Sequence, residues 1–311
     1  MQETVAVIDV GSNSIKLLVA CRAAEGVLSP LFSETIETRI STGISLENPR
    51  LQDTAIRAGA ETIAELVNLA TSYHPTQLEI VATSAVRDAS NGDDFTDAVF
   101  AKTGKRLRIL SGQEEATSIG RGVACDPALA GAEHFIQVDL GGGSLELVQF
   151  SSGQVTEAIS LQLGAVRLSE RFIDDNEAPI DPATEAQIRA TVIQSIQESG
   201  FPFPSPDIPF VATGGAFVIT RAILAAQQNL TIEEHSAELS LSAITTLKKD
   251  LCAKTLHQRM SVPHLPANRT DIIPTALITI EALMHHAERR AVFHSFCNLR
   301  FGIAAALLTS N

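Results

Sequence analysis

Two segments of the sequence share one pattern, and this internal repeat constrains the fold more than any other feature. VAVIDVGSNSIKLLVA (5–20) and FIQVDLGGGSLELVQF (135–150) each place an Asp before a glycine-containing tip that separates two strand-like runs. At one constant offset the corresponding residues are Asp9, Gly11 and Ser14 in the first copy and Asp139, Gly141 and Ser144 in the second. A single copy would be interpreted as an ordinary surface hairpin. The repetition instead indicates two copies of one supersecondary unit, and therefore a duplicated domain.

The residues around the repeat extend the duplication to whole domains. Three strand-like runs at about 5–10, 14–21 and 27–38 are followed by alternating helix and strand patterns up to residue 124. At His134 the pattern restarts with runs at about 134–140, 144–150 and 154–163, and helices then alternate with strands at Phe210–Ala212 and Ala291–Cys297. This order predicts an α/β protein with mixed sheets flanked by helices. We expect an N-terminal domain at 1–126 and a C-terminal domain at 127–311, whose last helix is free to pack back on the first.

The composition is that of a soluble globular protein. The 311 residues suggest two domains, and 45% of them are hydrophobic and 19% charged. The sequence has no apolar run of the roughly 18 residues that span a bilayer, and its first residues enter a strand at once. We therefore expect a cytoplasmic protein that does not bind membranes. A net charge of −13 argues against nucleic acid as a partner.

The four cysteines give no sign of a metal site or of disulfides. Cys21, Cys125, Cys252 and Cys297 lie far apart, without a C-x-x-C pair or a zinc-type His spacing. We expect four buried, reduced thiols.

The two repeated loops have the chemistry of a phosphate site. Because glycine has no Cβ atom, a glycine-rich loop lets backbone N–H groups converge on an anion. The candidate phosphate-binding residues are Gly11, Ser12, Asn13 and Ser14 in the first loop and Gly141, Gly142, Gly143 and Ser144 in the second. Asp9 and Asp139 end the preceding strands, where a carboxylate can hold Mg²⁺ directly or through water. By the two-residue period of a strand, Lys16 shares a face with Ser14, and Glu146 shares one with Ser144.

The segment ILSGQEEATSIG contains two adjacent glutamates that the helix geometry separates. Ser111 and Glu114 fit a capping box, in which Glu114 reaches back to the N-cap backbone. Glu115 points about 100° away around the helix, so it is free to face a ligand and act as a general base.

The basic residues have two interpretations each. In ATSAVRDASNG, Arg87 follows a strand and could bind phosphate through two parallel hydrogen bonds, or form a surface network with Asp88. The stretch with Lys102, Lys105, Arg106 and Arg108 is either solvated surface, which we favour, or a track for a polyanion.

Taken in order, the motifs resemble one known family. VAVIDVGSNSIKLLVA, ATSAVRDASNG, ILSGQEEA, VDLGGGSLEL and LQLGAVRLSERF are similar to successive motifs of the exopolyphosphatase and guanosine pentaphosphate phosphohydrolase family, within the actin-like ATPase superfamily. VATGGAF, NRTDIIPTALITIEAL and CNLRFGIAAAL resemble its C-terminal signatures more loosely. The resemblance implies two actin-like (ribonuclease H-like) domains with mixed five-stranded sheets and a ligand cleft between them. It is also compatible with a homodimer.

The resemblance further implies roles for individual residues. Both loops would bind phosphates, Arg87 would contact the phosphate chain, and Glu115 would activate the attacking water. Asp139, with Asp9 as the weaker candidate, would position Mg²⁺, and Lys16 and Glu146 would line the same cleft. Arg167 has either a structural or a phosphate-binding role.

The expected activity is the Mg²⁺-dependent release of orthophosphate from the end of inorganic polyphosphate. Guanosine pentaphosphate is the alternative substrate, since it presents the same terminal phosphoanhydride. Two other functions stay open: a small-molecule kinase of the same superfamily, with VATGGAF beside an adenosine pocket, and a non-catalytic sensor of phosphorylated ligands.

Overall fold

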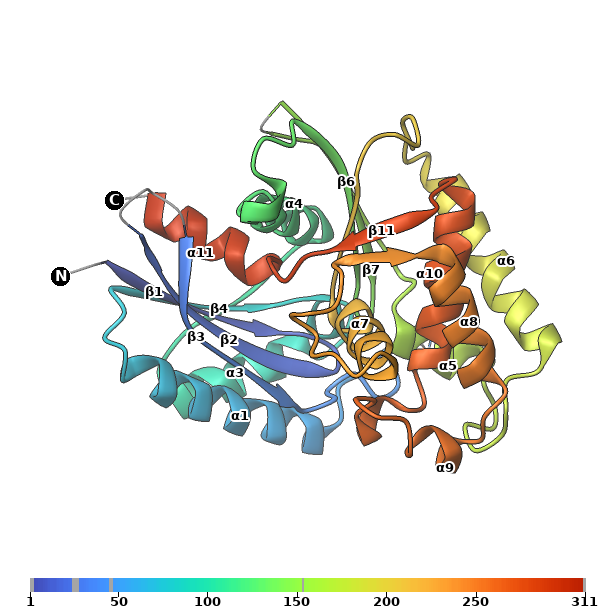
Figure 1. The fold of residues 1–311 in the computed structure, drawn as a ribbon. Coiled ribbons are helices and arrows are strands. Elements are labelled where there is room, and N and C mark those ends of the chain that lie inside the picture. Colours follow the sequence, from blue (N-terminus) through green and yellow to red (C-terminus); the bar gives the residue numbers. More distant parts are fainter. Residues whose placement is uncertain (1–2, 24–27, 45–46, 153, 310–311) are drawn as a thin grey trace. The chain divides into compact units, whose positions relative to one another are not determined.

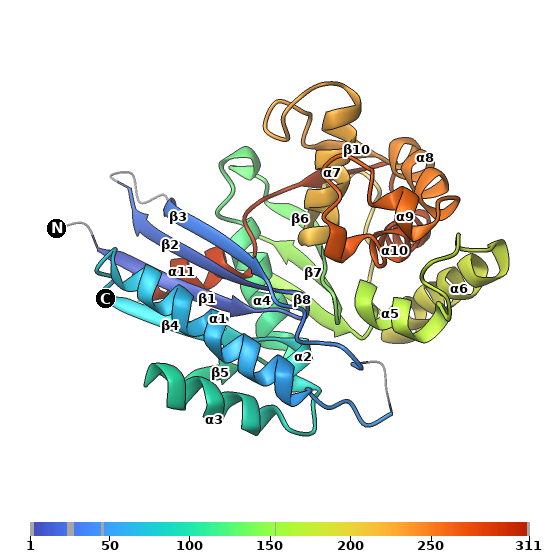
Figure 2. The same cartoon turned by 90° about the horizontal axis from the view of Figure 1, so that it is seen from below.

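The computed structural model describes residues 3–23, 28–44, 47–152 and 154–309. By their internal contacts the residues form two compact units, Met1–Ala132 with Cys297–Asn311, and Glu133–Phe296. Figures 1 and 2 give two views of the elements of each unit.

The first unit is built on a five-stranded mixed sheet in the order β3-β2-β1-β4-β5. The central strand β1 (Thr4–Val10) is buried along its whole length, as expected for a run of β-branched and apolar residues. It pairs antiparallel with β2 (Ser14–Arg22) and parallel with β4 (Gln77–Ala82). The edge strands are β3 (Leu28–Glu37) and the short β5 (Leu107–Ile109).

Helices cover both faces of this sheet. Figure 1 shows α1 (Asp53–Thr71) and α3 (Gly92–Thr103) on one face, and α4 (Gly112–Val123) and α11 (Leu299–Thr309) on the other. Helix α11 packs closely on α4, since a Cβ on Gly302 would lie 1.8 Å from the carbonyl oxygen of Ser118. The short elements are α2 (Ser84–Arg87) and a 3₁₀ turn at Pro127–Leu129.

The second unit contains a six-stranded sheet in the order β10-β11-β9-β6-β7-β8. Its strands are β6 (His134–Leu140), β7 (Leu145–Ser151), β8 (Gln154–Leu161), β9 (Phe210–Thr213), β10 (Glu238–Ser240) and β11 (Ala291–His294). As in the first unit, the strand before the loop pairs antiparallel with the strand after it and parallel with its other neighbour in the sheet. In the second unit these three strands are β6, β7 and β9. The duplication inferred from sequence is therefore present in the strand pairing.

Helix α10 (Ile273–His286) forms the centre of the helical layer of the second unit. Its residues are almost all buried, and it contacts α5, α6, α7 and α8. The other helices are α5 (Ala165–Phe172), α6 (Pro182–Ser199), α7 (Gly215–Gln227), α8 (Leu241–Cys252), α9 (Leu256–Arg259) and a 3₁₀ turn at Ala267–Arg269.

The predicted α/β class with mixed, helix-covered sheets is confirmed, with three differences in detail. The second sheet has a sixth strand, β10, so it is not five-stranded. The strand predicted at Ala291–Cys297 ends at His294. Helix α2 was not predicted, because four residues carry no periodic signal. Position 27, the predicted start of the third strand, lies outside the described residues.

Two further observations concern the burial of the cysteines and the length of the helices. Cys21, Cys252 and Cys297 are buried free thiols as predicted, but Cys125 is only partly buried, because it lies just beyond the end of α4. None of the helices in the described ranges is long and apolar enough to cross a membrane.

Candidate functional site

The two repeated loops have the same internal hydrogen bond. The Gly11 N–H donates to the Ser14 carbonyl at 3.1 Å, and the Gly141 N–H donates to the Ser144 carbonyl at 3.0 Å. The flanking strands keep the same register, which pairs Asp9 with Lys16 in the first unit and Asp139 with Glu146 in the second. The offset found in the sequence is thus an equivalence of backbone geometry.

The carbonyl groups of both loops are occupied by the chain segment that follows. In the first loop the Asn13 carbonyl accepts from the N–H groups of Thr38 and Arg39, at 3.1 and 2.9 Å. In the second loop the Gly142 carbonyl accepts from the first turn of α5, at 2.8 Å from the Val166 nitrogen. Because C=O and N–H point in opposite directions across a trans peptide, the Gly143 N–H points away from α5. The anchored carbonyls thus fix the orientation of the Asn13–Ser14 and Gly142–Gly143 peptide planes.

The loop glycines are not required by backbone conformation. Glycines with positive φ in the described part of the chain are Gly43, Gly104, Gly131, Gly200 and Gly214, and none of the loop glycines is among them. A Cβ on Gly141 would make only ordinary contact, 3.5 Å from the Ser144 carbonyl oxygen. Neither a positive φ nor a close contact within the protein therefore requires glycine at position 141.

The first loop is not a solvent-facing hairpin tip. Ser12, Asn13 and Ser14 are each 4% exposed. The Asn13 side chain donates to Glu37 at 2.7 Å and accepts from the Arg39 Nε at 2.8 Å. The Asn13 side-chain amide is thus engaged with these two residues, and a phosphate contact by Asn13 stays a prediction. Sequence reasoning missed Glu37 and Arg39, because no local pattern links them to the loop.

The adjacent glutamates separate as the helix geometry predicted. Ser111 caps α4, and Glu114 returns a hydrogen bond to the Ser111 N–H at 2.8 Å, which completes the capping box. These bonds lower the pKa of the Glu114 carboxyl, the backbone bond contributing most. The Glu115 side chain is only 7% exposed, whereas that of Glu114 is 53% exposed.

Arg87 and Glu115, both predicted as catalytic, are in direct contact. The Arg87 Nη1 donates to Glu115 Oε2 at 2.6 Å and to the Leu110 carbonyl at 3.0 Å. Arg87 also lies 3.6 Å from Asp88, so the alternative network with Asp88 is present as well. The Glu115 carboxylate is thus held in a fixed direction by a charge-assisted hydrogen bond, and its role as a general base stays a prediction.

The two aspartates have different surroundings. Asp9 is 7% exposed, and its Oδ1 has no hydrogen-bond partner among the described residues. Burial raises the pKa of this carboxyl, against the opposing charges of Lys16 and Arg300. Asp139 instead accepts a hydrogen bond from the Thr213 hydroxyl. Carboxylate oxygens at strand ends are chemically suited to hold Mg²⁺. The described residues contain no cluster of three or more His, Cys, Asp or Glu that could hold a metal by itself.

Three further candidate site residues make contacts with other residues of the chain. Glu146 is 1% exposed and accepts from the Ser160 hydroxyl at 2.7 Å, so it is more enclosed than predicted for a cleft-lining residue. Lys16 is half-buried opposite Asp9. Arg167 donates from Nε to the Gly143 carbonyl at 3.0 Å, which is the structural contact considered above. A phosphate contact by Arg167 stays a prediction.

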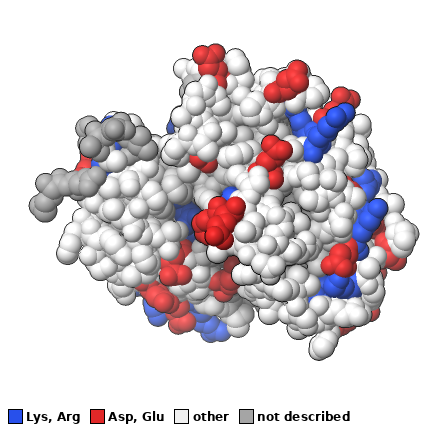
Figure 3. All heavy atoms as spheres, viewed as in Figure 1, with Lys and Arg blue, Asp and Glu red and all other residues white. Residues whose placement is uncertain are grey.

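The basic stretch from the end of α3 to β5 is solvated and interspersed with acids. Lys102 lies 3.7 Å from Glu61, and Arg108 bridges Glu79 and Glu114 at 2.7 and 3.1 Å. Figure 3 shows acidic and basic side chains side by side on one face of the molecule. This arrangement favours the surface interpretation over a polyanion track.

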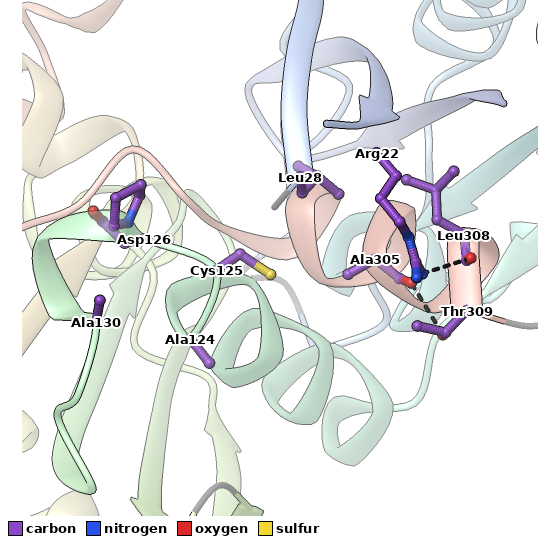
Figure 4. Close-up of a pocket in the computed structure, with 10 residues that line it drawn as sticks. Arg22, Leu28, Ala124, Cys125, Asp126, Ala130, Ala305, Leu308 and Thr309 are labelled. Carbon is purple, nitrogen blue, oxygen red and sulfur yellow. Dashed lines mark hydrogen bonds between the residues drawn. The ribbon is translucent and has the colours of Figure 1, made fainter. Parts of the chain in front are cut away.

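Two cavities of the first unit are separate from the candidate residues at the loops. One, of about 380 Å³, is lined by α11, by the turn after α4 and by the ends of β2 and β3 (Figure 4), and there Arg22 donates to the Leu308 carbonyl at 2.7 Å. Its thiol, Cys125, has its pKa raised by burial, which disfavours the reactive thiolate. The other, of about 340 Å³, is lined by α4 and α11 and includes Glu114 and Arg108. Neither cavity is lined by Arg87, Glu115 or the repeated loops.

Comparison with known proteins decides the family. The model of the Ppx/GppA phosphatase family matches residues 18–311. The chain belongs to the Ppx/GppA phosphatase family. This Ppx/GppA protein is 30% identical, over 301 residues, to exopolyphosphatase 2 of Mycobacterium tuberculosis, with 92% of each chain covered. The resemblance drawn from the motifs is therefore confirmed.

Solved structures of Ppx/GppA proteins share the fold. The family member from Aquifex aeolicus is 23% identical with a TM-score of 0.82, over 100% of this chain and 99% of that one. An exopolyphosphatase from Cytophaga hutchinsonii is 21% identical with a TM-score of 0.88, over 99% and 98%. These similarities confirm the predicted fold of two actin-like α/β domains for this Ppx/GppA protein.

Proposed function

We propose that this Ppx/GppA protein is an exopolyphosphatase, which hydrolyses the terminal phosphoanhydride of inorganic polyphosphate and releases orthophosphate. The observation that carries the proposal is the buried Glu115 carboxylate, held by Arg87 at 2.6 Å. Phosphoryl transfer needs little covalent help from a protein, but it needs an aligned chain, neutralised charge and an activated nucleophile. The 30% identity to a protein named exopolyphosphatase 2 supports the choice of substrate.

Glu115 has the features of a general base for the attacking water. Its carboxylate is oriented from one side by Arg87, which in turn is anchored on the Leu110 carbonyl. In the proposed reaction Glu115 accepts a proton as the water oxygen bonds to the terminal phosphorus and the bond to the bridging oxygen breaks. The products are orthophosphate and a chain one unit shorter. A positioned base typically contributes about 10²–10⁴-fold to the rate.

Arg87 and the two loops would neutralise and align the phosphate chain. The Arg87 side chain is 22% exposed, so part of it remains accessible. Loop N–H groups that point away from the anchored carbonyls are suitable donors to phosphate oxygens. The protein carries a net charge of −13, so binding of a polyanion has to rely on such local donors.

The carboxylates at the two strand ends fit Mg²⁺. In phosphoryl-transfer sites this ion is typically held by one or two carboxylates together with substrate phosphates and water. Asp139 would be the main protein ligand, and Asp9, with its unpartnered buried Oδ1, the second. When bound, Mg²⁺ would offset the charge of the phosphate oxygens.

One assay tests the proposal and separates its alternatives. Phosphate release would be measured side by side from long polyphosphate, short polyphosphate and guanosine pentaphosphate, each with Mg²⁺. We expect the highest kcat/KM with polyphosphate. A preference for guanosine pentaphosphate would reassign the substrate within the family, and no release from any of the three would overturn the proposal. Turnover of ATP that depends on a small hydroxylated acceptor would indicate a kinase.

A further inference from the structure

A chain of hydrogen bonds runs behind the second loop, through residues that the reaction described above does not use. The Thr213 hydroxyl donates to Asp139 Oδ2, and the Gln137 Nε2 donates to the Thr213 hydroxyl oxygen at 3.1 Å. Gln137 and Asp139 share one face of β6 by the two-residue period, and Thr213 pairs with Asp139 on the neighbouring strand β9. Gln137 and Thr213 are both completely buried.

The chemistry of the groups fixes the direction of this chain. A carboxylate has no proton to donate, so the single proton of the Thr213 hydroxyl goes to Asp139. The hydroxyl oxygen can then only accept, which requires the NH₂ side of the Gln137 amide. As a result the Gln137 Oε1 stays buried without a partner. An arrangement selected only for stability would not favour such an orphaned acceptor.

The backbone next to Thr213 restricts Asp139 further. Gly214 has a φ of +98°, and a Cβ there would lie 2.7 Å from Asp139 Oδ1. The carboxylate is therefore bonded on one oxygen and closely approached by main chain at the other.

The first copy of the repeat provides an internal comparison. Val81 pairs with Asp9 where Thr213 pairs with Asp139, and Val7 is the equivalent of Gln137. Neither valine side chain can donate a hydrogen bond, and Asp9 Oδ1 has no partner among the described residues. The hydroxyl and amide are therefore specific to Asp139 and not a general property of the repeated unit.

We infer that Thr213, oriented by Gln137, is a positioning residue that holds the Asp139 carboxylate in place as a ligand for a divalent cation. This inference rests on the proposed function, since that function assigns the cation to Asp139. Ligating carboxylates are commonly held by a further hydrogen bond, and loss of such a bond typically weakens metal binding by about 10–100-fold.

The test is the affinity for Mn²⁺ in the absence of polyphosphate, measured by electron paramagnetic resonance of the free ion, alone and with pyrophosphate. Thr213→Val keeps the shape of the side chain and removes the hydroxyl. Thr213→Ser restores the hydroxyl, and Thr213→Ala covers the case in which the valine variant does not fold. Thr220→Val is the matched control, because Thr220 is equally buried but donates to a carbonyl of its own helix.

We expect Thr213→Val and Thr213→Ala to weaken Mn²⁺ binding by about 10–100-fold, Thr213→Ser to recover most of it, and Thr220→Val to match the parent. Parent-like affinity of the valine or alanine variant would overturn the inference, and so would failure of the parent protein to bind Mn²⁺ in either condition. If the parent binds Mn²⁺ but releases no phosphate from polyphosphate, the proposed function fails while the role of Thr213 is still decided by the affinities.

Discussion

Glu114 and Glu115 are neighbours in sequence, but the first turn of α4 gives them opposite surroundings. Glu114 is exposed and bonded to Ser111 and Arg108, whereas Glu115 is buried against Arg87. A pair of matched substitutions can therefore separate a capping role from a catalytic one at adjacent positions.

We expect Glu115→Gln to lower kcat on polyphosphate by at least about 100-fold, because the amide keeps the shape of the side chain but cannot accept the proton of water. Substrate binding should persist, which equilibrium binding of polyphosphate would check.

Glu114→Gln is the control, since Gln also completes a capping box. Its kcat should stay within about threefold of the parent value, which is the small effect expected of an exposed side chain. If Glu114→Gln were inactive and Glu115→Gln active, the assignment of the two glutamates would be wrong.

Arg87 is expected to depend on the planar shape of its side chain. One Nη1 atom bonds both Glu115 and the Leu110 carbonyl, a geometry that a flexible ammonium group reproduces poorly. Arg87→Lys should raise KM and lower kcat, since the base loses its orientation. Steady-state kinetics on polyphosphate would measure both, and a lysine variant with parental constants would mean that only the charge matters.

At the scale of elements, the loop of the second unit depends on its contact with the start of α5. Gly164 caps this helix, and a Cβ there would lie 2.3 Å from the Gly142 carbonyl oxygen. Since the clash is with backbone, the helix or the loop must move.

Gly164→Ala should therefore reduce phosphate release strongly and destabilise the protein, by about 1–3 kcal/mol as for other overpacked sites. Activity and urea unfolding would be measured together. Gly141→Ala is the comparison for stability, since its Cβ would meet only one atom, at 3.5 Å. Equal stability of the two variants would contradict the tight packing of α5 on the loop.

The elements show which parts of the structure can be predicted from sequence. The repeat predicted the strand register around both loops, because alternation along a strand is a local property. The contacts of Asn13 with Glu37 and Arg39 were not predicted, since they depend on how distant residues approach. Gln137 did leave a signal: it is a polar residue in a buried strand, at the position where the first copy has Val7.

At the scale of the whole molecule, one buried histidine should contribute to acid sensitivity. Arg221 donates to the Nδ1 of His294, so the ring is neutral with its proton on Nε2, which is buried without a partner. Burial, with the charge of Arg221, lowers the pKa of His294 to about 4.

Between this pKa and the ordinary value near 6.5, the unfolded chain binds the proton and the folded protein does not. His294 therefore contributes stability fully above pH of about 6.5, and this contribution is lost as the pH falls towards 4. Going from pH 7 to pH 5 should cost about 2 kcal/mol through this residue. His294→Gln should show a correspondingly smaller pH dependence in urea unfolding, and an unchanged dependence would mean that other groups dominate.

The last prediction concerns whether the two copies of the repeat serve one reaction. If both loops bind the same phosphate chain, a Cβ in either loop obstructs the approach of the backbone to the anion and damages the same step. Gly11→Ala and Gly141→Ala should each reduce phosphate release while the protein stays folded, since the added atoms meet only a carbonyl oxygen, at 3.1 and 3.5 Å.

The double variant of these two glycines distinguishes a shared ligand from two independent sites. Residues that act as one unit fail together, so the double variant should be clearly less impaired than the product of the single effects. Steady-state kinetics of the four proteins would complete the cycle. Full additivity would mean that the loops act in separate steps, and a fully active Gly11→Ala variant would remove the first loop from phosphate binding.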